Sequence, residues 1–64
     1  MNELEFIAML QDAIISYDIE NANMITETST FEQAGLLTAN NGLVVTMNDD
    51  VFQIKVVQSK EAVQ

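Results

Sequence analysis

The first residues of the chain repeat apolar side chains at the spacing of an α-helix. At 100° per residue, Glu5 and Asp12 fall on one face, and an apolar stripe falls on the other. The stripe contains Phe6, Ile7, Leu10, Ala13, Ile14 and Tyr17. Asn2, with Glu5 three residues later, has the form of a helix-capping box. We therefore expect an amphipathic helix over residues 2–17.

The pattern changes to that of β-structure towards the C-terminus. Residues 43–47 are rich in β-branched side chains, which suit a pleated surface. Residues 51–57 alternate, and the face expected to be buried carries Phe52, Ile54 and Val56. Asn48, Asp49 and Asp50 lie between the two runs and are typical turn residues. Together these features predict a β-hairpin.

The middle of the chain has weaker signals. Residues 21–29 contain several threonines, which predict a short strand at a sheet edge. Residues 30–33 have the form of a capped helical turn that Gly35 would end, and the dipeptide at residues 41–42 is typical of a tight turn. Residues 59–64 show no pattern, and we expect them to fray.

These elements predict a single domain over residues 1–64 in the α+β class. One N-terminal helix would pack on a small antiparallel sheet of three to four strands that ends in the hairpin. The expected core consists of Phe6, Leu10, Ile14, Tyr17, Ile25, Phe31, Leu36, Leu37, Val45, Phe52, Ile54 and Val56.

Three valines are left over once the expected core is filled. Val44, Val51 and Val57 fall on the sheet face that should meet water. Exposed apolar strand residues in so small a domain are typical of a contact surface. We therefore expect self-association through the hairpin, with a homodimer as its simplest form.

The composition excludes several kinds of chemistry. The chain has no cysteine and no histidine, so it has no disulfide framework, thiol nucleophile or ordinary zinc site. Its serines have no candidate base beside them, and Asp49 and Asp50 are explained by the turn. We expect no catalytic residues, no metal, no cofactor and no enzymatic activity. No signal peptide or membrane span is apparent, which predicts a cytoplasmic protein without a membrane partner.

Charge changes the picture most. Ten acidic residues oppose two lysines, for a net charge of −8, and residues 1–54 contain no base. Such a chain should be repelled by nucleic acid and attracted by a basic protein. The expected partner-binding residues are Glu5, Asp12, Asp18 and Glu20. An ordinary solvated surface that keeps the protein soluble is the plainer explanation of the same acids.

In its length, its acid excess and its lack of cysteine and histidine, the chain resembles small acidic proteins of phages and mobile elements. Some of these, including DNA mimics and anti-CRISPR proteins, block host defence or host nucleic-acid enzymes. Residues 30–57 also look like short reading frames of bacterial mobile elements. The resemblance implies a non-enzymatic inhibitor, in the host cytoplasm if phage-encoded, that occupies the basic surface of a nuclease or other nucleic-acid-binding effector.

Two other functions fit the sequence. The first is a self-assembling structural or regulatory subunit that associates through its C-terminal hairpin. The second is a small-ligand binder with a pocket at a dimer interface. Apolar residues on both hairpin faces favour self-assembly, whereas the one-sided charge favours the acidic inhibitor.

Overall fold

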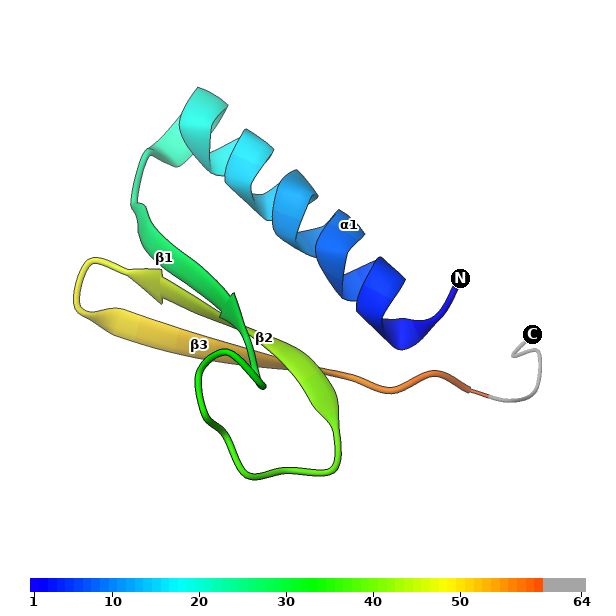
Figure 1. Cartoon of the computed structure of the whole chain (residues 1–64). Coiled ribbons are helices and arrows are strands. Elements are labelled where there is room, and N and C mark those ends of the chain that lie inside the picture. Colours follow the sequence, from blue (N-terminus) through cyan, green and yellow to red (C-terminus); the bar gives the residue numbers. More distant parts are fainter. Residues whose placement is uncertain (60–64) are drawn as a thin grey trace.

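A computed structural model describes residues 1–59 and shows one helix packed on a three-stranded antiparallel sheet (Figure 1). The predicted α+β class, with its N-terminal helix and its hairpin, is confirmed. The elements in chain order are α1 (Glu3–Tyr17), η1 (Asp18–Ala22), β1 (Ile25–Thr30), β2 (Asn41–Met47) and β3 (Asp50–Val56). The expected fraying of residues 59–64 falls almost wholly outside the described residues.

Helix α1 begins where the capping box predicts. The Asn2 side chain accepts a hydrogen bond from the Glu5 backbone N–H at 2.8 Å, and the Asn2 N–H donates to Glu5 Oε1 at 3.0 Å. At its other end α1 continues into the π-helical turn η1. The chain leaves this turn at Asn23, which has the left-handed φ of 51°. Asparagine tolerates this conformation better than most residues.

The sheet has the order β1-β2-β3, so β2 is the central strand. Strands β2 and β3 form the hairpin, in which Met47 pairs with Asp50 across a turn whose first residue, Asn48, has a φ of 52°. The short strand expected in residues 21–29 is β1, and its register with β2 shifts between Ile25 and Glu27.

The core lies between α1 and the central strand. Ile7 of α1 is 1 % exposed, and Leu43 and Val45 of β2 are 0 % and 4 % exposed. The half-buried side chains around them are Leu10, Ile14, Ile25, Met47, Ile54 and Val56. Leu43 carries no distinguishing signal in the sequence, because its strand is apolar on both faces.

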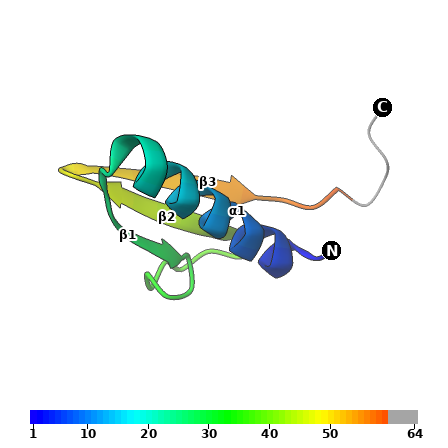
Figure 2. The same ribbon diagram turned by 90° about the horizontal axis from the view of Figure 1, so that it is seen from above.

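Part of the expected core is wrong. Phe52, Tyr17 and Leu37 are exposed to 52 %, 67 % and 103 %, and Phe6 is exposed to 40 %. The register of Phe52 is as expected, since it lies opposite Val45 and so faces the helix side of the sheet. However, α1 lies across β2 and β1 and makes few contacts with β3 (Figure 2). The helix side of β3 is therefore left partly uncovered.

The predicted turn at residues 41–42 is also wrong, because both residues belong to β2. Gly42 is needed for packing: a Cβ atom there would lie 2.5 Å from Cε2 of Phe31 and 2.5 Å from the carbonyl oxygen of Ile54. The ring of Phe31 thus packs directly on the backbone of the central strand. Phe31 is buried, and it lies on the face of the sheet that α1 does not cover.

The capped turn that begins at Thr30 has the predicted form. The backbone N–H of Gln33 donates to Thr30 Oγ1 at 3.1 Å, and the N–H of Thr30 donates to Gln33 Oε1 at 2.9 Å. Gly35 ends the turn with a φ of 75°. This turn holds Phe31 in place at the edge of the sheet.

Candidate interaction surfaces

The acids predicted to form one surface are not equivalent. Glu5 and Asp12 are exposed on the side of α1 that faces away from the sheet, and Glu20 is exposed in η1. The carboxylate of Glu5 is also part of the helix cap. Asp12 and Glu20 are therefore the members of this set whose carboxylates face solvent and carry no structural bond in the described chain.

Asp18 does not belong to an exposed surface, and that expectation is wrong. Its side chain is 6 % exposed. One carboxylate oxygen accepts the Met24 N–H at 2.7 Å, and the other accepts the Ile25 N–H at 3.1 Å. Asp18 thus binds the N–H of the first residue of β1 and the N–H of the residue before it, and so fixes the passage from helix to sheet. The sequence offers one signal for the burial of Asp18, its position just after the apolar stripe. That position does not reveal that the chain turns back into β1 directly after the helix.

Exposed acids gather at one end of the molecule. The end of the helical segment, with Glu20, and the hairpin turn, with Asp49 and Asp50, are both on the side of the molecule opposite the two termini, although Figure 1 shows a gap between them (Figures 1 and 2). Glu27 in β1 is exposed and lies opposite Thr46, near the same turn. Lys55 is the only basic side chain in residues 1–59. We call Glu20, Glu27, Asp49 and Asp50 the acidic end.

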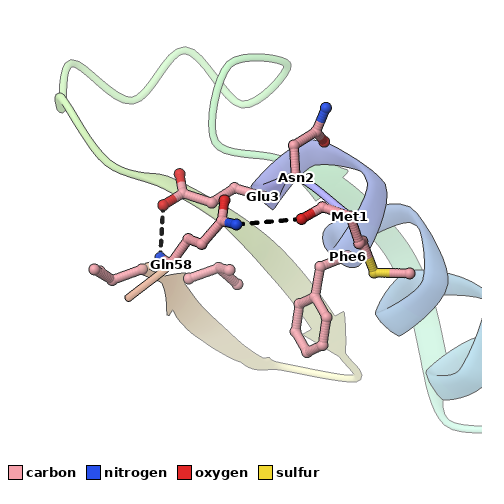
Figure 3. A pocket seen from close by; sticks show the side chains of 7 residues that line it. Met1, Asn2, Glu3, Phe6 and Gln58 are labelled. Carbon is pink, nitrogen blue, oxygen red and sulfur yellow. Dashed lines mark hydrogen bonds between the residues drawn. The ribbon is translucent and has the colours of Figure 1, made fainter. Parts of the chain in front are cut away.

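The N-terminus of α1 is tied to the segment that follows β3. Glu3 Oε2 accepts the backbone N–H of Gln58 at 2.7 Å, and Glu3 Oε1 accepts the side-chain amide of Asn41 at 2.8 Å. These donors lower the pKa of Glu3, the Gln58 backbone N–H most strongly. The Gln58 side chain donates in turn to the Met1 carbonyl at 3.3 Å (Figure 3).

A hollow of about 200 Å³ lies beside this contact. Phe6 projects into it from α1 (Figure 3), and Val56 and Val57 line it from the other side. A second hollow of about 270 Å³ has an almost wholly apolar lining and lies under the last turns of the helix. It is lined by Ala13, Ile14, Tyr17, Asp18, Ala22, Ile25 and Met47. Both hollows therefore offer mainly apolar contact.

The three surplus valines occupy different surroundings. Val51 and Val57 are exposed to 59 % and 65 %. Val44 is half-buried in the central strand, where its neighbours are Ser29 on one side and Gln53 on the other. The structure therefore places Val51 in the edge strand β3 and Val57 directly after it, whereas Val44 lies in the central strand.

No protein-family model, curated protein or solved structure matches this chain. Within residues 1–59, no helix has the length and apolar character needed to cross a membrane. The same residues contain no group of three acidic side chains that could hold a metal ion.

Proposed function

We propose that this protein is a non-enzymatic interaction protein whose acidic surface binds a basic surface of another protein. The observation that carries the proposal is the separation of two kinds of acid. The carboxylates of Glu3, Glu5 and Asp18 serve the fold by accepting hydrogen bonds. Asp12 and the acidic end are exposed, and Lys55 is the one basic side chain available to balance them in residues 1–59.

Concentrating like charges has a physical cost. Carboxylates at one end of a small domain repel one another, and mixed charges would keep the protein soluble without that repulsion. A surface that attracts a basic partner offers a reason for the arrangement, because a field of one sign accelerates encounter with a partner of the other sign. Direct binding to nucleic acid is disfavoured by the same charge.

The partner class that fits best is a protein that itself binds nucleic acid. Such proteins carry basic grooves that follow a phosphate backbone without reading its sequence. A rigid acidic surface can compete for such a groove. Asp12 on α1 and Glu20 in η1 would contribute to that surface together with Asp49 and Asp50.

The test begins with capture of partners from a bacterial lysate, at low and at high salt. Binding kinetics of the recovered partner are then compared for Asp12→Lys, Glu20→Lys and the control Glu32→Lys. Glu32 is also an exposed acid, but it lies on the turn after β1, away from the acidic end. The three variants change the net charge equally.

We expect Asp12→Lys and Glu20→Lys to lower the association rate and flatten its salt dependence, whereas Glu32→Lys has little effect. Added double-stranded DNA should release the captured partner. Equal rates for all three variants would show that the acids act only through net charge. Association that is insensitive to salt would rule out the electrostatic mechanism altogether.

A further inference from the structure

We propose that two copies of this chain associate through the free edge of β3, which pairs antiparallel with its symmetry mate about Ile54. The two sheets would then continue as one six-stranded sheet. The edge of β3 is a different part of the molecule from the acidic surface.

The core of a single copy is small. Four hydrophobic side chains are buried in residues 1–59, whereas eleven large ones are exposed to 40 % or more. A core of this size stabilises a short chain only weakly. Several of the exposed side chains lie on β3 or beside its end, namely Phe6, Val51, Phe52 and Val57. Association along β3 would cover them.

The two edges of the sheet differ in how well they are protected. Strand β1 has the polar sequence ITETST, carries the charge of Glu27 and has an irregular register at its start. These features discourage pairing with another strand. Strand β3 has seven residues in unbroken register with β2 and exposes apolar side chains. Strand β3 also carries two charges, Asp50 and Lys55, but its regular register and exposed apolar side chains leave it the less protected of the two edges.

The backbone of β3 presents its hydrogen-bonding groups at this edge. The Phe31 N–H donates to the Gly42 carbonyl at 3.0 Å, so the peptide groups of Gly42 point towards β1. Lys55 is paired with Gly42, and its own N–H and C=O must then point away from β2. Every second residue of β3 shares this direction, so Val51 and Gln53 also point their backbone groups outwards.

The sequence of β3 fits pairing with itself. Residues 51–57, VFQIKVV, have the same order of apolar and polar side chains when read in either direction from Ile54. A two-fold axis at Ile54 places Phe52 opposite Val56 on the helix side of the sheet. On the other side Val51 meets Val57, and Gln53 meets Lys55. Cross-strand pairs of like character stabilise a sheet, and a shift of register would place Val51 opposite Lys55.

Charge and size also favour a second copy of this chain as the occupant. Strand β3 contains one acid, Asp50, and one base, Lys55, so its net charge is zero although the chain carries −8. Antiparallel pairing sends the two acidic ends in opposite directions. An interface of standard size covers roughly 800 Å² on each partner, about one-sixth of the 5058 Å² that the chain exposes.

The mass of the full chain in solution, measured by light scattering over a dilution series, tests the association. We expect twice the chain mass of 7.1 kDa at high micromolar concentration and dissociation on dilution. Val57→Lys and Val51→Glu should each weaken dimerisation roughly tenfold, since symmetry places each substitution at two sites. Leu37→Lys is the control, because Leu37 is fully exposed and lies outside β3.

The double variant Val51→Glu/Val57→Lys tests the register. Its opposite charges would face each other across the axis at Ile54, so it should dimerise more tightly than either single variant. Backbone amides of Val51, Gln53 and Lys55 should also exchange hydrogen more slowly as concentration rises. A monomeric parent at high micromolar concentration would overturn the proposal. So would a double variant that is no tighter than the single ones, provided that circular dichroism shows an intact helix.

Discussion

The replacement of Gly42 by alanine tests the packing of the central strand. A Cβ atom at this position would meet the ring of Phe31 and would lie 2.5 Å from the carbonyl oxygen of Ile54. The ring can move slightly. The carbonyl belongs to the backbone of β3, which is paired with β2, and it cannot retreat without distorting the hairpin.

The expected cost follows from overpacking, which destabilises well-packed sites by about 1–3 kcal/mol. A glycine-to-alanine change at a permissive site has the opposite sign and stabilises by about 0.4–1 kcal/mol, because it restricts the unfolded chain. The sign of the effect therefore reports whether the Phe31 ring and the Ile54 carbonyl fill the space beside Gly42, and the Phe31→Leu background separates the contribution of the ring. In a chain of this length, each kcal/mol lowers the melting temperature by about 4–8 °C.

Thermal and urea denaturation of Gly42→Ala, in parent and Phe31→Leu backgrounds, provide the measurement. The smaller leucine should relieve part of the clash, so the alanine should cost less in that background. Gly35→Ala serves as a control in which alanine is opposed by backbone strain and not by packing. Nothing lies within 4 Å of the Cβ position at Gly35, and its φ is 75°. Its cost should therefore be the same in both backgrounds. A Gly42→Ala variant as stable as the parent would refute the packing.

Four further predictions concern stability. Leu43→Ala should lower the free energy of unfolding by about 2–5 kcal/mol. The loss should be clearly larger than that for Phe52→Ala, with both measured at a concentration where the chain is monomeric, and the reverse order would contradict the observed core. Asp18→Ala should cost at least about 1.5–3 kcal/mol, the range for one hydrogen bond to a charged group, and an unchanged unfolding midpoint would show that its two bonds are dispensable. Because the pKa of Glu3 is lowered in the folded protein, its carboxylate stabilises the fold at pH values above the ordinary pKa of a glutamate, and this stabilisation is lost as the pH falls through the lowered pKa. Glu3→Gln should remove this pH dependence and speed hydrogen exchange of the Gln58 backbone amide. Sodium chloride should raise the melting temperature, since the Debye length falls from about 30 Å towards 8 Å between 0.01 M and physiological salt, and a flat trend would mean that the acids are locally compensated.

Local patterns predicted the elements of this fold because the forces involved act within a few residues. The Asn2–Glu5 cap and the apolar stripe determine where α1 begins and which face it buries. The same holds for the turn from Thr30 to Gly35, whose reciprocal hydrogen bonds join neighbours. The alternation in β3 likewise gave the correct face for Phe52.

Features that depend on how the elements meet were not accessible in this way. The pattern cannot reveal that α1 leaves the helix side of β3 partly uncovered at Phe52, and so it predicts Phe52 in the core. The dipeptide at residues 41–42 is typical of a turn. The ring of Phe31, which packs on Gly42, shows instead why a glycine is needed there. Asp18 is one acid among many in the sequence. Its burial follows from the sharp return of the chain into β1.

The two proposed surfaces are compatible because they occupy different parts of the molecule. Pairing about Ile54 joins the chains along β3, while Asp12 remains on the outer side of α1 and Glu20 at the acidic end. The axis lies perpendicular to the joined sheet, so both helices cover the same face and the two hairpin turns point in opposite directions. The net charge doubles, but the acidic ends are kept apart, which limits their mutual repulsion. Such a dimer would present two separated acidic ends, so a partner with two basic patches would bind it more tightly than a single copy.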